Sequence, residues 1–547
     1  MHIIKQITDE MEAVEGVRLL NVDPGKATNR TVVTFVGNPQ AVIEAAFRAI
    51  KKAGELIDMT RHGGEHPRMG ATDVCPLIPI ANITMEETAQ YAQQLAKRVG
   101  EELQLPVYLY EAAQPDKARN NLSVIRAGEY EGFFKKIKLP EWKPDFGPAE
   151  FDAKRGATVI GARDFLVAYN VNLNTTSTRR ANAIAFDVRE AGRKLKMENG
   201  ELKTIPGSLK CVKAIGWYIE EYGIAQISIN LTNIYITPVH IAFDEVCKKA
   251  DARGIRVTGS ELVGLIPLKA MLDAGKYFLN KQKRSVGVSE KELIKIAVKS
   301  LGLDELTPFK PEEKIIEYML KNKSGSQLVN MTLTDFADET ASESPAPGGG
   351  SIAAYVGSLG ASLATMVANL SSHKKGWSKG TPSGEERWEE FSMWAEKGQQ
   401  YKDELLHLVD ADTKAFNQIM SAMSLPKVSE EEKTVRKKAI QEATKLAIEI
   451  PFKVMQASYN SMEVIKAMAE IGNPNSVSDA GVGALCARSA VMGAFMNVRI
   501  NAAGYDDASA CSAGFVNEII SKGKEIEKNA IALEGEILNV VNEKIGV

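Results

Sequence analysis

The chain has 547 residues, of which 44% are hydrophobic and 25% are charged, and its formal net charge is −3. This length exceeds what one hydrophobic core supports, and it predicts roughly three or four domains of ordinary soluble composition. The small net charge provides no basic field for nucleic acid or anionic lipid, so any anion must be recognised locally.

The cysteines and the N-terminal residues argue against further classes of protein. The cysteines are far apart, odd in number and without a CxxC pair, which predicts neither a disulfide framework nor a metal site. They are Cys75, Cys211, Cys247, Cys486 and Cys511. The opening MHIIKQITDEMEAVEG has no apolar signal core and predicts an amphipathic helix. We therefore expect a reduced, cytoplasmic protein without bound metal.

The front half alternates strand and helix signals. Arg30–Gly37 is rich in β-branched residues and leads into a Gly-Asn-Pro turn, so it predicts a strand. Ala41–Leu56 has the apolar spacing of a helix, and Ala71–Ile80 and Val107–Tyr110 are apolar runs typical of strands.

The same order of elements recurs later. Ala225–Leu231 predicts a strand and Pro238–Arg253 a helix, and Gly259–Leu268 ends in LIPL where the earlier copy ends in LIPI at 77–80. A chance similarity is the alternative to a true repeat. Units this short favour two ferredoxin-like α/β subdomains over a long doubly wound sheet.

After Phe309 the strand signals end. A charged helix over Pro311–Lys321 and the polar KNKSGS indicate a linker. Helical runs separated by prolines follow at 334–342, 350–372, 384–424, 429–450, 452–471, 478–503 and 507–544. We predict a multidomain chain, an N-terminal α+β part with two ferredoxin-like α/β subdomains followed by an all-α helical bundle. The predicted domains are 1–165, 166–310, the linker 311–330, and 331–547.

One segment invites a different interpretation. Ser344–Ser372 contains no charged residue, and Ile352–Leu370 has about the length of a membrane span. Its many small residues suit a helix packed closely inside a bundle, so we expect no membrane span.

Residues 61–73, RHGGEHPRMGATD, form the first candidate site. A loop with this many glycines, placed between a helix and a strand, exposes its backbone and side chains. His66 is its candidate acid/base, because the pKa of a histidine lies near neutrality and a neighbouring carboxylate shifts it. A surface or structural histidine is the alternative.

Long segments of the front half match one known family in order. They are TNRTVVTFVG (28–37), LIDMTRHGGEHPRMGATDVCPLIPI (56–80), IRAGEYEG (125–132), DFGP (145–148), GATVIGARDFLVAYNVNL (156–173), IGWYIEEYGIAQISINLTN (215–233) and GSELVGLIPLKAML (259–272). The front half resembles glutamate formimidoyltransferase, which transfers a formimino group from formimidoylglutamate to tetrahydrofolate. The resemblance implies His66 as the acid/base and Asp23 as a supporting acid at the same site.

The resemblance also implies a folate-binding loop, with an ordinary surface loop as the alternative. The loop consists of Gly147, Pro148, Ala149, Glu150, Phe151, Asp152, Ala153, Lys154, Arg155 and Gly156. Folate N5 attacks an amidine carbon in this reaction, and glutamate leaves as an amine that needs a proton. One histidine can manage both proton movements, and Asp23 can orient it or pair with the amidinium.

The second candidate site lies in the back half. The segment PGGGS at 347–351 runs into the apolar helix, where bare N–H groups can face an anion, although a simple cap is the alternative. One helical face near residue 410 carries Leu405, Leu408, Val409, Asp412, Phe416 and Ile419. Burying an unpartnered carboxylate costs roughly several kcal/mol. Asp412 is therefore a candidate functional acid, and a structurally satisfied buried acid is the alternative.

Segments of 331–547 match a second family in order. They are SPAPGGGSIAA (344–354), LVDADTKAFNQIM (408–420), KLAIEIPFKV (445–454), GNPNSVSDAGVGA (472–484) and GAFMNVRIN (493–501). This half resembles formimidoyltetrahydrofolate cyclodeaminase, an ammonia lyase whose catalytic acid falls on Asp412. Helix caps and helix–helix hydrogen bonds are the alternative for the polar candidates for its pocket. The pocket candidates are Gly348, Gly349, Gly350, Ser351, Asn473, Ser478, Asp479, Asn497 and Asn501.

Together the halves resemble bifunctional formimidoyltransferase-cyclodeaminase, which makes 5,10-methenyltetrahydrofolate and ammonia in histidine degradation. The resemblance implies tetrahydrofolate, in polyglutamylated form, as the co-substrate, and a homo-oligomer assembled through the helical domain. One alternative is a cyclodeaminase whose front half is impaired or uses N-formylglutamate. Another is a non-catalytic folate-binding or scaffold protein.

The sequence departs from the family at its beginning. The family opens with a strand and a loop of the form VPNFSEG, and this sequence begins in what corresponds to the next helix. We therefore expect a missing strand in the first sheet, with unpaired backbone groups beside it. Either the start is misplaced or truncated, or transferase activity is impaired.

Overall fold

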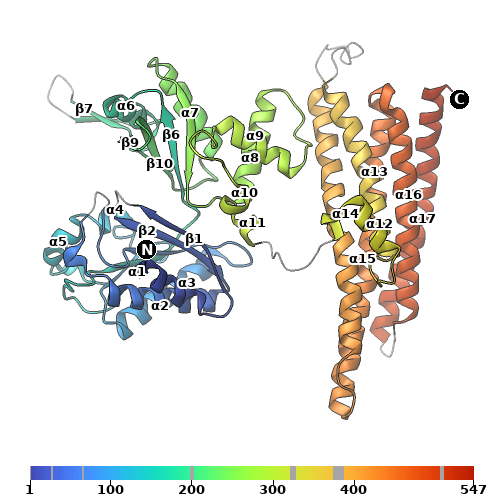
Figure 1. Cartoon of the computed structure of the whole chain (residues 1–547), viewed down its shortest axis with the longest axis horizontal. Helices are drawn as coiled ribbons and strands as arrows, with labels where there is room; N and C mark the ends of the chain where they lie inside the picture. The colour runs from blue at the N-terminus through green and yellow to red at the C-terminus, as the bar shows by residue number, and fades with distance from the viewer. Residues whose placement is uncertain are drawn as a thin grey trace. The chain divides into compact units, whose positions relative to one another are not determined.

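The computed structural model describes residues 2–25, 29–63, 67–196, 202–320, 328–373, 387–505 and 510–546. The chain divides into two compact units, which are described separately (Figure 1). The first comprises Met1–Met271 and Leu301–Lys321, and the second comprises Leu272–Ser300 and Asn322–Val547. All strands of the described residues belong to the first unit. The predicted order of an α/β region followed by a helical region is confirmed.

The first unit begins with a helix and a hairpin. Helix α1 (His2–Glu12) leads into β1 (Val17–Gly25) and β2 (Arg30–Gly37), which pair antiparallel. Helix α2 (Pro39–Leu56) starts at Asn38, whose side chain accepts a hydrogen bond from a backbone N–H of the first turn at 2.9 Å. The strand predicted over Arg30–Gly37 and the helix that follows it are confirmed.

Three further strands form a parallel sheet in the order β3-β5-β4. They are β3 (Val74–Leu77), β4 (Val107–Glu111) and β5 (Thr158–Ala162). Helix α3 (Met85–Glu102) precedes β4 and packs with α2 in one core cluster that includes Leu77 of β3. The cluster also receives Phe35 of β2, so one helical layer covers the hairpin and this sheet. The short helices are α4 (Leu122–Ile125) and α5 (Glu129–Lys136).

The remainder of the first unit is a four-stranded antiparallel sheet in the order β11-β6-β10-β9. Along the chain the elements alternate as strand, helix, strand, strand, helix, strand. They are β6 (Val167–Leu173), α6 (Thr178–Val188), β9 (Val212–Ile219), β10 (Ile224–Leu231), α7 (Val239–Asp251) and β11 (Val257–Val263). A small hairpin of β7 (Arg193–Lys196) and β8 (Leu202–Ile205) is inserted after α6, and α10 (Pro311–Lys314) and α11 (Ile316–Leu320) complete this unit.

Long helices make up most of the second unit (Figure 1). Their apolar faces meet in one large core cluster. They are α12 (Leu333–Thr340), α13 (Gly349–Ser372), α14 (Trp388–Met423), α15 (Glu430–Ile471), α16 (Val477–Ala503) and α17 (Ala510–Ile545). The predicted helical bundle is confirmed.

Two helices of the second unit come from the part of the sequence assigned to the front half. They are α9 (Glu290–Leu301) and most of α8 (Leu268–Lys281). Between them, the Gly287 carbonyl accepts a hydrogen bond from Asn369 Nδ2 at 2.7 Å. A β-carbon on Gly287 would overlap Ala395, so glycine permits this approach. Such tertiary contacts leave no local signal in the sequence, and the predicted domain bounds stay predictions.

Helices α13 and α16 pack closely through small side chains. A β-carbon on Gly360 would come 2.9 Å from the Gly483 carbonyl oxygen, so the two backbones are near contact. Both helices are long and apolar enough to cross a membrane, by length and composition alone. Their most apolar windows are 61% and 50% buried within the protein, as in the core helices of soluble proteins, so this is weak evidence for a membrane.

Pro451 lies inside α15, where the proline-separated runs predict a break between two helices. That prediction is wrong, because the helix continues from Glu430 to Ile471. A proline has no N–H to donate to the carbonyl four residues earlier, here that of Ala447. Asn501 Nδ2 donates to this carbonyl at 2.7 Å, so the neighbouring helix replaces the missing hydrogen bond.

We expect Asn501→Ala to lower the free energy of unfolding of the helical unit by about 1–3 kcal/mol, because it leaves a buried carbonyl without its partner. Denaturant unfolding followed by circular dichroism measures this change. Pro451→Ala restores the backbone N–H, so Asn501→Ala should cost much less in that background. An equal cost in both backgrounds would show that the two residues are not linked.

Candidate active sites

Asp412 lies on the core-facing side of α14. Leu405, Leu408 and Val409 of the same helix are at most 4% exposed, and Ile419 packs against the same core cluster. The helical face predicted from residue spacing is therefore confirmed. A carboxyl group in these surroundings loses water, which disfavours its charged form.

Ser351 is the principal partner of Asp412. Its Oγ lies 3.0 Å from Asp412 Oδ2, 3.0 Å from the Val409 carbonyl oxygen and 3.2 Å from Thr413 Oγ1, and the serine is fully buried. Burial raises the pKa of Asp412, and hydrogen bonds from the hydroxyl and backbone N–H of Ser351 oppose that rise. Ser351 stands in the first turn of α13, whose N–H groups favour an anion. The carboxyl group is thus placed to accept and return a proton.

Glycines let the backbone of α13 approach this carboxyl group closely. A β-carbon on Gly350 would overlap Asp412 Oδ1, and one on Gly349 would come 3.1 Å from Asn497 Nδ2. Gly348 is the N-cap residue of α13, and a β-carbon there would meet nothing closer than 3.9 Å. The structure therefore brings the first turn of α13 together with Asp412 and Asn497.

The remaining candidates for the cyclodeaminase pocket lie at or near the two ends of α16. Asn501 lies one turn beyond Asn497 and binds the carbonyl exposed by Pro451. Asn473, Ser478 and Asp479 lie at or just before the opposite end of the helix. At the usual helical rise, Asp479 is about 27 Å from Asn497 along the axis. Within one chain, these three residues do not meet Asp412.

The loop of the first candidate site opens into a groove of about 1610 Å³ in the first unit. Residues 64–66, and with them His66, lie outside the described residues. Beside them, Asn29 Nδ2 donates to the Gly63 carbonyl at 2.9 Å, and Arg68 donates to the His62 carbonyl at 2.9 Å. His62 and Arg68 both line the groove. The role of His66 stays a prediction.

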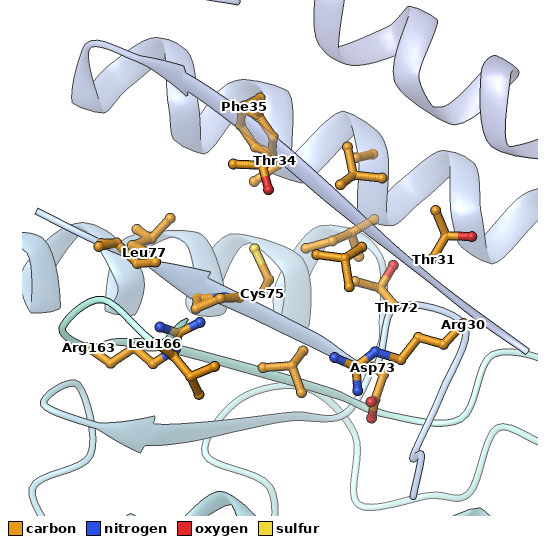
Figure 2. Close-up of a pocket in the computed structure, with 18 of the residues that line it drawn as sticks. Arg30, Thr31, Thr34, Phe35, Thr72, Asp73, Cys75, Leu77, Arg163 and Leu166 are labelled. Carbon is orange, nitrogen blue, oxygen red and sulfur yellow. The ribbon is translucent and has the colours of Figure 1, made fainter. Parts of the chain in front are cut away.

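Four arginines line the groove, namely Arg30, Arg68, Arg126 and Arg163, and the first three lie beside this loop. Arg126 forms an ion pair with Asp73, and Figure 2 shows Arg30 beside Asp73 at one end of the groove. Burial and the Arg126 guanidinium lower the pKa of Arg30, and Asp73 opposes this shift. Among the described residues, the Nε–H groups of Arg68 and Arg126 are buried without an acceptor. Such donors suit a carboxylate ligand.

The sequence reasoning missed these arginines, although each stands in a matched segment of the front half. The three arginines stand in separate segments, and nothing in the sequence around them indicates that they line the same groove. Only the fold brings Arg30, Arg68 and Arg126 to the same groove.

Asp23 lies in β1, opposite Val32 of β2, and is half-buried. It is not among the residues that line the groove. Because His66 lies outside the described residues, the supporting role of Asp23 stays a prediction.

The predicted folate loop, 147–156, is held by its own side chains and by the loop 61–73. Asp152 accepts a hydrogen bond from the Arg155 backbone N–H at 2.9 Å and pairs with its Nε at 2.6 Å. The Arg155 carbonyl accepts a hydrogen bond from the Ala71 N–H at 2.8 Å. The loop therefore packs beside the first candidate site, although none of its residues lines the groove. Folate binding by this loop stays a prediction.

The described residues contain no group of three or more His, Cys, Asp or Glu that could hold a metal ion. Cys75 lines the groove, where burial raises the pKa of its thiol to about 12. At neutral pH this cysteine is therefore an uncharged, weakly reactive side chain.

Comparison with known proteins relates both units to one set of enzymes. The model described as "Formiminotransferase domain, N-terminal subdomain" matches residues 1–163, "Formiminotransferase domain" matches 168–321, and "Formiminotransferase-cyclodeaminase" matches 332–514. The formimidoyltransferase-cyclodeaminase of Gallus gallus is 45% identical over 504 residues, which cover 91% of this chain and 89% of that protein.

Relatives of the separate parts match as well. The glutamate formimidoyltransferase of Streptococcus pyogenes serotype M1 is 39% identical over 277 residues, covering 51% of this chain and 88% of that protein. The methenyltetrahydrofolate cyclohydrolase of Methylorubrum extorquens is 34% identical over 216 residues, covering 40% of this chain and 98% of that protein.

Proposed function

Because the chain belongs to the formimidoyltransferase-cyclodeaminase family, we propose that it catalyses two consecutive steps of histidine degradation. The first transfers the formimino group of N-formimidoyl-L-glutamate to tetrahydrofolate, and the second converts 5-formimidoyltetrahydrofolate into 5,10-methenyltetrahydrofolate and ammonia. The observation that carries the proposal is the desolvated carboxyl group of Asp412, held by Ser351 at the first turn of α13.

In the transfer step, N5 of tetrahydrofolate bonds to the formimino carbon, and the bond from that carbon to the glutamate nitrogen breaks. His66 takes the proton from N5 and returns it to the departing amine. Formimidoylglutamate carries two carboxylates, and the buried guanidinium groups of Arg68 and Arg126 provide suitable donors for them. These contacts orient the donor beside the loop of His66.

In the cyclisation step, N10 bonds to the carbon of the protonated, cationic formimino group, and the bond from that carbon to the terminal nitrogen breaks. The Asp412 carboxylate takes the proton from N10 and passes it to the nitrogen, which leaves as ammonia. A raised pKa favours this exchange, because the carboxyl group takes up a proton more readily than an exposed aspartate does. The product keeps the positive charge delocalised over N5 and N10.

The test is the balance of products from the purified chain. With formimidoylglutamate and tetrahydrofolate, we expect glutamate, methenyltetrahydrofolate and ammonia in equal amounts. N-formylglutamate is the control donor, because it has no nitrogen to release as ammonia. Glutamate release without ammonia, or a preference for the formyl donor, would contradict the proposal.

The close contact between Gly350 and the Asp412 carboxyl group allows a direct test of the role of Asp412. Gly350→Ala is expected to lower the rate of cyclodeamination at least tenfold, because the methyl group displaces the carboxyl group. Gly348→Ala is the matched control, since a β-carbon two residues earlier comes no closer than 3.9 Å to any neighbouring atom. Steady-state assay with 5-formimidoyltetrahydrofolate measures both, and equal losses in the two variants would argue against this geometry.

We propose that the folate is polyglutamylated. A second groove, of about 380 Å³, is lined by Lys427, Lys433, Arg436 and Lys437, with Tyr505 at its side. Tyr505 follows the end of α16, the helix that carries Asn497. A cluster of cations beside the end of this helix suits the carboxylates of a glutamyl tail.

Charge reversal at this groove tests the proposal. Lys433→Glu is expected to raise the KM for pentaglutamyl folate by about tenfold, equivalent to roughly 1.4 kcal/mol, and to leave that for monoglutamyl folate unchanged. Lys438→Glu is the control, because Lys438 is on the same helix and does not line the groove. The same shift for both folates would exclude a tail-binding role.

Two further proposals concern assembly and fold. We propose a homo-oligomer that forms through α13 and α16. It is supported by exposed apolar side chains on these helices, which are Leu359, Met366, Leu370, Val482, Leu485, Met496 and Ile500. We also propose ferredoxin-like topology for the α/β subdomains, supported by the order of elements from β6 to β11. The cytoplasmic location stays a prediction.

A further inference from the structure

Helix α5 contacts the segments of both arginines that the transfer step assigns to the donor carboxylates, Arg68 and Arg126. In its first turn, Glu131 Oε1 accepts a hydrogen bond from Arg68 Nη2 at 2.5 Å. At its last residue, Lys136 Nζ reaches the backbone on either side of Arg126. One short helix therefore holds two guanidinium groups, one through each of its ends.

Lys136 fixes the turn that carries Arg126. Its Nζ donates to three carbonyls that flank this arginine, at 2.8, 2.7 and 3.1 Å, namely those of Val124, Ile125 and Ala127. The Arg126 carbonyl accepts a hydrogen bond from the Glu129 N–H at 2.7 Å. Each carbonyl from residue 124 to residue 127 thus has a donor, and the turn is held along its whole length.

The ammonium group of Lys136 matches these acceptors in number. A protonated lysine has three N–H donors, one for each of the three carbonyls. Its Nζ also lies 3.8 Å from the centre of the Trp142 ring, which favours a cation. Burial lowers the pKa of Lys136 to about 8, so the group is still mostly protonated at neutral pH. The carbonyls and the ring replace the water that burial removes from it.

These contacts leave one donor of each arginine unused. Arg68 donates to Glu131 and to the His62 carbonyl. Arg126 forms an ion pair with Asp73. In the part of the chain that the structure describes, both Nε–H groups are buried without an acceptor. A guanidinium group that is already fixed loses little conformational freedom when a carboxylate binds to its remaining donor.

We propose that Lys136 and Glu131 are positioning residues for the transfer step. Lys136 fixes the turn of Arg126 and Glu131 fixes the side chain of Arg68, so both Nε–H groups are in place before the donor binds. This inference rests on the proposed function, in which these arginines bind the two carboxylates of formimidoylglutamate. Because these contacts are the same in the bound substrate and in the transition state, their loss raises KM and leaves kcat nearly unchanged.

The experiment measures kcat of transfer and the KM for formimidoylglutamate in variants of the full chain. Lys136→Met keeps the length of the side chain and removes all three donors, so it is expected to raise KM about tenfold with kcat within about twofold. Lys135→Met is the matched control and should leave both constants unchanged, because Lys135 is exposed on the same helix and lies over the Phe134 ring. Glu131→Ala is expected to raise KM about threefold, since the Arg68 side chain keeps its hydrogen bond to the His62 carbonyl.

A double-mutant cycle decides whether Lys136 acts through Arg126. Arg126→Met alone should raise KM at least about tenfold, and Lys136→Met in that background should raise it no further. An unchanged KM in Lys136→Met, or its full effect in the Arg126→Met background, would overturn the inference. An unchanged KM in Arg126→Met would instead contradict the donor-binding role that the proposed function gives to this arginine.

A second variant and a second measurement keep the test decisive if Lys136→Met does not fold. Lys136→Gln keeps one amide group as a donor and is expected to raise KM about threefold. The dissociation constant of formimidoylglutamate, measured by titration calorimetry, needs no turnover and should rise in the same order as KM. A dissociation constant in Lys136→Gln equal to that of the wild type would likewise overturn the inference.

Discussion

Asp412→Asn is expected to lower the rate of cyclodeamination of 5-formimidoyltetrahydrofolate by about 100- to 10,000-fold, the usual contribution of a general acid–base group. The amide keeps the size of the side chain and its contact with the buried Ser351 hydroxyl, but it cannot take a proton from N10. Transfer of the formimino group to tetrahydrofolate should continue at the wild-type rate. Steady-state assay of each step with its own substrate measures the two effects separately.

Asp412→Asn is expected to lower the rate but not the stability of the folded protein at neutral pH. Because burial raises the pKa of Asp412, the folded protein binds this proton more tightly than the unfolded chain does. The proton on Asp412 stabilises the fold fully below the pKa of this group in the unfolded chain. This stabilisation is lost as the pH rises through the higher pKa of Asp412 in the folded protein. At neutral pH the asparagine variant should therefore be at least as stable as the wild type, and its advantage should shrink as the pH falls. A variant that is less stable at neutral pH and slow in both reactions would point to a structural role.

His66→Ala is expected to lower the rate of transfer by about 100- to 10,000-fold and to leave cyclodeamination of supplied 5-formimidoyltetrahydrofolate unchanged. The loop around it already has its partners, since Asn29 and Arg68 hold the neighbouring backbone at Gly63 and His62. Loss of the imidazole should therefore remove proton transfer without unfolding the loop. The measurement is the release of glutamate at saturating tetrahydrofolate.

His62→Ala distinguishes the two histidines of the loop. His62 lines the groove and lies 3.3 Å from Asn29 Nδ2 through its Nδ1 atom. Its removal is expected to raise the KM for formimidoylglutamate more than it lowers kcat. If His62→Ala abolished turnover and His66→Ala did not, the acid/base assignment would pass to His62.

The helical site could largely be predicted from the sequence because its signal is local. Leu405, Leu408 and Val409 mark the buried face of α14, and Asp412 stands out on it as a charged residue in an apolar row. The glycines at the start of α13 are likewise visible as a run. Their meeting with Asp412 and Ser351 depends on how two helices pack, which spacing along one helix does not reveal.

Other features could not be predicted, because they depend on contacts between segments that are distant in the sequence. The sequence suggested a break at Pro451, but a side chain from another helix replaces the lost hydrogen bond and the helix continues. Arg30, Arg68 and Arg126 come from three segments that only the fold brings to one groove. The repeat suggested by LIPI and LIPL stays a prediction, because β3 pairs parallel with β5 whereas β11 pairs antiparallel with β6.

We expect one chain to carry two separate active sites, one at His66 and one at Asp412. The most direct measurement mixes the His66→Ala and Asp412→Asn proteins and follows the conversion of formimidoylglutamate and tetrahydrofolate into methenyltetrahydrofolate. Each variant alone should fail to complete the conversion, and the mixture should restore it through release of 5-formimidoyltetrahydrofolate from one protein to the other. If either variant alone completed the conversion at the wild-type rate, or if the mixture failed although each variant kept its own step, the claim would be contradicted.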